Sequence, residues 1–218
     1  MKKVIAAIVL CVLAFIGFFV YQGHEKSIQN DLYEEAAVFF EEEDYKKAIQ
    51  YFEEAREHDN LFTGSLDEEL SYYQAEAYAN LGEYEEAIEI YDRMIGENPK
   101  EAMNYTLKEY CLYHAGDYEQ AAQVYEEGYQ QTGEESFLAS LANLYVSIEE
   151  YEKALAIVKD SDEKNAEDVK KELKFLEIVI YEKQQEYEAA YEKAVAFCEA
   201  YPEDEQGIRE RDFLESRK

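Results

Sequence analysis

An all-α fold is predicted by three features of the sequence: few turn-forming residues, many aromatic residues and a tyrosine that recurs in a fixed frame. The 218 residues include only 9 Gly and 2 Pro, which disfavours a chain of short strands. They also include 21 Tyr and 11 Phe, which argues against disorder despite a net charge of −30. The same charge excludes a function that depends on a basic nucleic-acid footprint.

The first element is an apolar segment without charge, residues 4–21, preceded by Lys2 and Lys3. Its 18 residues predict a membrane-spanning signal anchor near the lower length limit. The positive-inside rule then leaves residues 1–3 as a cytoplasmic tail and places everything after the span outside the cytoplasm, with residues 22–28 as a linker. The expected localisation is the cell membrane, single-pass, with the repeat domain extracytoplasmic.

Two other interpretations of this segment stay open. A cleaved signal peptide needs small residues before its cleavage site, whereas the segment ends in the bulky run Phe18–Tyr21. A lipoprotein would carry its lipid on Cys11, but Leu10 stands where that processing site needs a small residue. A retained anchor is therefore favoured.

The tyrosine frame is an internal repeat. It occurs five times, at Tyr45–Ala48, Tyr84–Ala87, Tyr118–Ala121, Tyr151–Ala154 and Tyr187–Ala190. Successive tyrosines are 39, 34, 33 and 36 residues apart, and both prolines, Pro99 and Pro202, fall fifteen residues after a repeat tyrosine. A period near 34 predicts stacked helical hairpins, because a single hairpin cannot bury its apolar face.

This pattern resembles the tetratricopeptide repeat, a 34-residue unit of two antiparallel helices with small residues at positions 8 and 20 and aromatic residues at 11, 17 and 24. With the shared tyrosine as position 17, position 20 is Ala in all five units and position 8 is Ala36, Ala75 and Ala142 in three. The resemblance predicts a helical-hairpin solenoid with repeats at residues 29–62, 68–101, 102–135, 135–168 and 171–204, followed by a capping helix at 205–218.

Departures from the pattern predict local irregularities. Glu109 and Ile178 occupy position 8 in repeats three and five, so those hairpins should splay or shift. A bend is expected near residues 59–66, and a loosened fourth repeat around residues 160–168. In the capping helix, Ile208, Phe213 and Leu214 should cover the end of the stack.

Boundary residues predict where helices begin and turn. The segments Ser65–Glu68 and Thr132–Glu135 have the form of capping boxes, and Pro99 suits a first helical position. Gly82 and Gly116 are expected in the turns between paired helices.

In tetratricopeptide repeats, positions 2, 5, 9, 12 and 13 line the concave surface, which implies a groove rich in aromatic residues here. The candidate binding residues are Tyr33, Phe40, Tyr72, Asn80, Tyr110, Tyr113, His114, Asn143 and Phe175, with Glu76 and Glu172 among them. Basic residues are nearly absent from these positions, Lys183 being the exception, so a clamp for an acidic C-terminus is not expected. The groove suits a protein or peptide with apolar anchors and basic flanks. Packing between repeats is the alternative role of these aromatic residues.

No enzyme, cofactor or metal is predicted. The sequence has no glycine-rich phosphate loop, no HExxH, no CxxC and no GxSxG, and its three histidines stand apart. The segment Asp160–Asn165 begins like a calcium loop, but Lys164 occupies a ligand position. A disulfide between Cys111 and Cys198 is not expected, because they lie in well-separated repeats.

The resulting hypothesis is a membrane-anchored extracytoplasmic scaffold that mediates protein–protein interaction at a bacterial cell envelope, without nucleic acid. Two alternatives remain: a self-associating structural envelope protein, and a glycan-binding or cell-wall-acting protein. The oligomeric state and the identity of the partner stay open.

Overall fold

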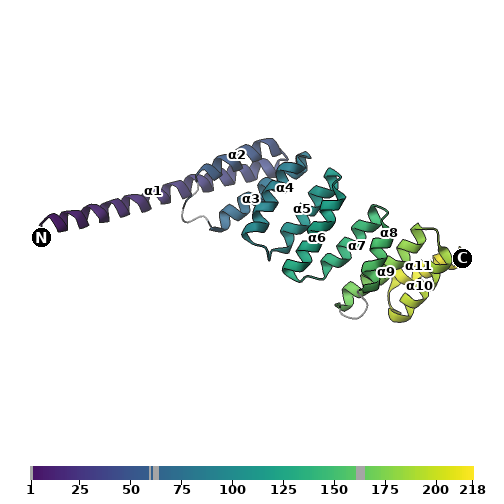
Figure 1. The fold of residues 1–218 in the computed structure, drawn as a ribbon. Coiled ribbons are helices and arrows are strands. Elements are labelled where there is room, and N and C mark those ends of the chain that lie inside the picture. Colours follow the sequence, from purple (N-terminus) through teal and green to yellow (C-terminus); the bar gives the residue numbers. More distant parts are fainter. Residues whose placement is uncertain (1, 59, 61–63, 161–164) are drawn as a thin grey trace. The chain divides into compact units, whose positions relative to one another are not determined.

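Eleven helices and no strands occupy the residues that the computed structural model describes, which are 2–58, 60, 64–160 and 165–218, with the side chains of residues 2–8, 64 and 65 outside the description. Their bounds are α1 Lys2–Glu41, α2 Tyr45–Glu57, α3 Gly64–Leu81, α4 Tyr84–Glu97, α5 Ala102–Ala115, α6 Tyr118–Thr132, α7 Ser136–Ser147, α8 Tyr151–Asp160, α9 Glu167–Lys183, α10 Tyr187–Ala200 and α11 Glu205–Glu215 (Figure 1). The all-α prediction is confirmed. The helices form two compact units, Met1–Asn98 with α1–α4 and Pro99–Lys218 with α5–α11.

Each predicted repeat is a helical hairpin, and the second helix of every hairpin begins at the shared tyrosine. The residue two places before that tyrosine has a positive φ in all five turns. In two turns it is Gly82 (φ 77°) or Gly116 (φ 84°), as predicted. In the other three it is Glu43, Glu149 or Gln185, with φ between 60° and 64°. One left-handed residue at this place reverses the chain in every repeat.

Small residues lie where the paired helices meet. The position-20 alanines are all fully buried, as are the three position-8 alanines: Ala48, Ala87, Ala121, Ala154, Ala190, Ala36, Ala75 and Ala142 are each 0% exposed. Position 24 is buried in all five repeats, by Phe52, Tyr91, Tyr125, Val158 and Ala194. The small side chains allow close approach of the helices, and the larger ones fill the space beside them.

The two irregular position-8 residues are accommodated inside packed hairpins. Ile178 is fully buried in a cluster with Ala190 and Ala194 of α10. Glu109 is 8% exposed, and its Oε2 accepts a hydrogen bond of 2.7 Å from the hydroxyl of Tyr125. Burial raises the pKa of Glu109 above its ordinary value, although the Tyr125 hydrogen bond acts in the opposite direction.

Two predicted helix starts are wrong. Helix α5 begins at Ala102 and not at Pro99, whose carbonyl accepts a hydrogen bond of 3.2 Å from the Tyr105 hydroxyl. No capping box forms at Thr132–Glu135: α6 continues through Thr132 and ends at Gly133, which takes a left-handed conformation. That glycine is a C-terminal cap, so the next helix starts only at Ser136.

Several predictions fall wholly or partly on residues outside the description. They are the Ser65 cap, the bend near residues 59–66, and the loosened part of repeat four with its calcium-like segment, which includes residues 161–164. Helix α8 ends at Asp160, the first residue of the calcium-like segment.

Helix α1 continues without interruption from Lys2 to Glu41 (Figure 1). Residues 22–28, expected as a linker, belong to this helix, because the segment contains no proline to break it. Among the residues searched, no helix combines the length and apolar character that crossing a bilayer requires, and residues 4–8 of the predicted span are among those whose side chains are not described.

The middle of α1 is tied to the rest of its unit by polar contacts. Glu25 Oε2 lies 2.7 Å from Nδ1 of His58, the residue after α2, and this contact lowers the pKa of Glu25. The fully buried amide of Gln29 donates to Asp67 of α3 and accepts from Asn60, both at 3.0 Å. Buried polar groups that satisfy one another in this way specify a single arrangement.

The capping helix α11 covers the end of its unit, as predicted. Leu214 is fully buried and Ile208 is half-buried, but Phe213 is 40% exposed. Phe213 precedes Leu214 and so points to a different side of the helix, where the Arg217 guanidinium carbon lies 4.3 Å from its ring centroid.

Candidate functional site

The candidate residues of the first unit form an aromatic strip on the first helices of repeats one and two. Tyr33 and Phe40 lie two turns apart on α1, and Tyr72 and Tyr73 are on α3. The Tyr73 ring centroid is 5.3 Å from Tyr72, 5.5 Å from Phe40 and 6.3 Å from Tyr33. All four side chains are half-buried. The aromatic strip is therefore a set of mutually supported rings that are each partly exposed, and Tyr33, Phe40 and Tyr73 also pack against the core of the first unit.

Carboxylates frame the aromatic strip. The Tyr33 hydroxyl donates to Glu69 Oε2 at 3.1 Å, and burial together with this carboxylate raises the pKa of Tyr33 to about 12. Burial and nearby Glu76 raise the pKa of Tyr72, and burial also raises the pKa of Glu76 itself. A phenol with the ordinary pKa of 10.0 is already neutral at physiological pH, and the raised pKa values extend the pH range over which Tyr33 and Tyr72 stay neutral.

Asn80 lies at the C-terminal end of α3, where its side-chain amide donates to the backbone carbonyl of Glu76 at 2.9 Å. The side chain is exposed, but this hydrogen bond keeps the amide on its own helix. Asn80 therefore lies on the exposed surface of α3 and is not one of the stacked rings.

In the second unit, three candidates gather at the end of α5. The His114 ring centroid lies 4.3 Å from Tyr110 and 5.6 Å from Tyr113, and Tyr113 also contacts Tyr118 at 5.3 Å. Tyr110 is 49% exposed and Tyr118 41% exposed. These four rings make a second aromatic surface, the α5 cluster.

The remaining two candidates take part in contacts between helices of the same unit. The Asn143 amide donates to the Ala139 carbonyl at 3.0 Å and to Glu172 Oε1 at 3.2 Å, which connects α7 to α9. Phe175 packs edge-on against Phe197 at 5.5 Å. These contacts give both side chains a role in packing.

Two contributors to the first site were missed by the sequence analysis. Tyr73, at repeat position 6, is the central ring of the strip, and it is absent from the set of groove positions that the resemblance supplies. Glu69 is at position 2, which belongs to that set, but it was not singled out among so many carboxylates. The adjacent tyrosines Tyr72 and Tyr73 were the one feature of the sequence that could have indicated Tyr73 as a member of the strip.

The cysteines and acidic groups are the remaining candidates for a thiol or metal site. Cys111 and Cys198 are buried free thiols. Burial raises the pKa of Cys111 to about 11 and also raises that of Cys198. Within the described ranges, no group of three or more His, Cys, Asp or Glu is placed to hold a metal ion.

Comparison with known proteins agrees with this architecture. A family model described as tetratricopeptide repeat matches residues 33–102, the region of the first two repeats. The fold is that of a tetratricopeptide repeat protein. No curated protein matches the sequence.

Solved structures share the fold at low sequence identity. One from Parabacteroides merdae ATCC 43184 is 16% identical with a TM-score of 0.60, over 86% of this chain and 72% of that chain. MamA is 17% identical with a TM-score of 0.55, over 84% of this chain and 97% of that chain. A chain of the Naa15/Naa10 complex bound to HypK-THB is 13% identical with a TM-score of 0.61, over 84% of this chain but 28% of that chain.

Proposed function

We propose that this chain is a membrane-anchored scaffold whose repeat units lie outside the cytoplasm and dock another protein through the aromatic strip. The observation that supports the proposal is the strip itself, with four half-buried rings on two neighbouring first helices and Glu69 and Glu76 beside them. The partner segment would bring apolar side chains to the rings and basic residues to the carboxylates. The role is binding without catalysis.

The physical basis of docking is the preorganisation of the rings. Tyr33, Phe40 and Tyr72 each contact Tyr73, so little side-chain freedom is left to lose when a partner binds. Aromatic residues in such surfaces dominate binding energy, and the flanking carboxylates add specificity for basic groups. The net charge of −30 would speed the encounter and make it salt-sensitive.

The anchor and its orientation are proposed from the N-terminal sequence. Residues 4–21 are apolar and follow Lys2 and Lys3, which favours a cytoplasmic N-terminus. The helix that contains this segment continues into the first hairpin. A partner would therefore be held close to the outer face of the membrane.

The docking proposal is tested with a Phe40→Ala, Tyr72→Ala double variant in full-length protein, crosslinked in membranes and purified. The matched control is Tyr129→Ala, which removes an exposed tyrosine on α6 outside the aromatic strip. We expect the control to recover crosslinked partners as the wild type does, and the strip variant to lose them. Helical circular dichroism of both variants confirms folding, and equal recovery by all three proteins would refute docking at the strip.

The orientation is tested by thiol labelling from outside the cell. Cys198 is a poor reporter because it is buried with a raised pKa, so a cysteine is introduced at exposed Glu188 (Glu188→Cys). An impermeant maleimide should label this variant in intact spheroplasts, and the wild type should stay unlabelled. Labelling of the variant only after permeabilisation would place the repeats in the cytoplasm and overturn the proposal.

A further inference from the structure

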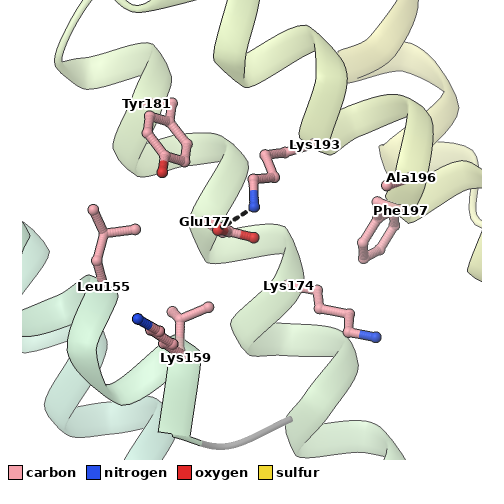
Figure 2. Close-up of a pocket in the computed structure, with 9 residues that line it drawn as sticks. Leu155, Lys159, Lys174, Glu177, Tyr181, Lys193, Ala196 and Phe197 are labelled. Carbon is pink, nitrogen blue, oxygen red and sulfur yellow. Dashed lines mark ion pairs between the residues drawn. The ribbon is translucent and has the colours of Figure 1, made fainter.

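A pocket with basic residues lies between α8, α9 and α10 of the second unit. Its volume is about 560 Å³. Its lining combines the apolar side chains of Leu155, Val158, Ala196 and Phe197 with Tyr181, Lys159, Lys174, Lys193 and Glu177. Figure 2 shows Lys193 reaching from α10 to Glu177 of α9, an ion pair of 2.6 Å, with Lys159 and Lys174 below that pair in the view. The lining carries three ammonium groups and one carboxylate, in a chain whose net charge is −30.

The basic character is specific to this place in the array. Lys159 is at repeat position 25, where the first three repeats have Glu53, Asp92 and Glu126. In repeat one the position-25 carboxylate accepts a hydrogen bond of 3.0 Å from the hydroxyl of Tyr78, at position 11 of the next repeat. Tyr181 is the position-11 tyrosine of repeat five, and the pocket that it lines contains Lys159 in place of an acid.

A corresponding pocket one repeat earlier shows the contrast. It lies between α6, α7 and α8, and its charged lining residues are Glu119, Glu126, Glu150 and Lys153. Tyr145 stands there at position 11, as Tyr181 does in the basic pocket. The same architectural position therefore has an acidic lining in one case and a basic lining in the other.

We propose that the pocket between α8, α9 and α10 binds a short acidic segment of a partner protein, with carboxylates at Lys159 and Lys174 and one apolar side chain against the apolar lining residues. Lysine ammonium groups are point charges on flexible stems, and they suit carboxylates presented in varied geometry. Because the lining contains both apolar and charged side chains, it matches a peptide that alternates the two characters.

A peptide fits better than a free small molecule because the pocket is open at the surface. Lys159 is exposed and Lys174 is half-buried, so a small ligand would not be enclosed as such ligands usually are. The long-range repulsion from the acidic body is screened within about 8 Å at physiological salt. The nearby lysines then determine the local attraction for a carboxylate.

The test uses full-length protein and a fluorescent peptide, Glu-Asp-Glu-Phe-Glu-Asp-Glu, with binding followed by fluorescence anisotropy. The variant is Lys159→Glu, Lys174→Glu. The matched control is Lys46→Glu, Lys183→Glu, which makes the same charge change at two exposed lysines outside the pocket lining. A second pocket variant, Lys159→Gln, Lys174→Gln, removes the charges without reversing them.

We expect the double Glu variant to bind the peptide about tenfold more weakly than the control variant, and the double Gln variant to lie between them. A peptide with Ser in place of Phe should also bind more weakly to wild-type protein, because the apolar lining residues lose their apolar partner. Equal affinity of the pocket and control variants would overturn the proposal. Displacement of the peptide by an equal concentration of inorganic phosphate would overturn it too, since the site would then recognise any anion.

Discussion

Hairpins α5–α6 and α7–α8 are neighbours in one unit and share one architecture, but they differ at repeat positions 8, 15, 24 and 25. At position 8, α5–α6 buries Glu109 beside Tyr125, whereas α7–α8 has Ala142 and, at position 24, Val158. The other differences are Gly116 against Glu149 in the turn, and Glu126 against Lys159 at position 25. The interior of the hairpin accommodates a carboxyl group where a phenol is present to donate a hydrogen bond to it, as Tyr125 does to Glu109. On the surface, position 25 accommodates either an acid or a lysine.

The largest effect is expected from placing the buried acid of hairpin α5–α6 into the equivalent position of hairpin α7–α8. Ala142→Glu puts a carboxylate at a fully buried position in a cluster with Val158 and no phenol at position 24. We expect a loss of about 3–5 kcal/mol in the free energy of unfolding, because an unpaired charge is buried and the site is overpacked. Urea denaturation measures it, and a loss below about 1 kcal/mol would show that the phenol is not needed.

A smaller effect is expected from removing the phenol that holds Glu109. Tyr125→Phe should cost about 1–3 kcal/mol, because a buried carboxyl group loses its hydrogen bond. The matched control is Tyr78→Phe, which removes the exposed bond to Glu53 and should cost about 0.5 kcal/mol or less. Similar losses for the two variants in urea denaturation would contradict the distinction between the buried and exposed pairs.

The turns provide a change in the opposite direction. Glu149 has a φ of 64°, a conformation that is unfavourable for a side-chain-bearing residue. Glu149→Gly should stabilise the hairpin by about 0.5–1 kcal/mol, less than the relief of strain alone because glycine also makes the unfolded chain more flexible. Gly116→Ala, at φ 84°, should raise the strain and lower the melting temperature. If both changes destabilise the protein, backbone strain is not the controlling factor.

The smallest expected effect is a pH dependence of the stability of hairpin α5–α6. The pKa of Glu109 is raised by burial above the ordinary value of 4.5. The folded protein thus retains a proton that the unfolded chain has lost, and the contribution of Glu109 to stability falls as the pH rises from 4.5 through the raised pKa. Below 4.5 both states are protonated and the penalty is absent.

Glu109→Gln removes this titration, so the difference in melting temperature between wild type and variant should grow as the pH rises from 4 to 7 in favour of the variant. The comparison cancels the many carboxylates that both proteins share. A difference that stays constant over this range would show that Glu109 titrates normally.

The repeat could be predicted from the sequence because burial between the paired helices restricts which residues occur at positions 20 and 24. Alanine at position 20 and a larger apolar or aromatic residue at position 24 in most repeats follow from close helix packing, and the structure buries them all. The turns were readable only where glycine marks them. Glu43, Glu149 and Gln185 adopt the same positive φ although their side chains disfavour it, because the paired helices leave one conformation for the connection.

The sites were less predictable than the fold. The family positions identified Tyr33, Phe40 and Tyr72, but the central ring, Tyr73, is defined by its neighbours in space. The basic pocket was missed because its lining comes from three helices between residues 155 and 197, and no short motif connects them. The Lys159 charge reversal becomes visible only when position 25 is compared across repeats.

The unbroken helix α1 has a mechanical consequence. Forty residues of continuous helix span about 60 Å, and the second half of that length is one wall of the first hairpin. Glu25 and Gln29 of α1 contact the residues after α2 and Asp67 of α3. These contacts restrict rotation of α1 where it joins the hairpin. A force or torque applied near the N-terminus would therefore be transmitted along the helix to α2 and α3. A flexible linker in the same place would not transmit it.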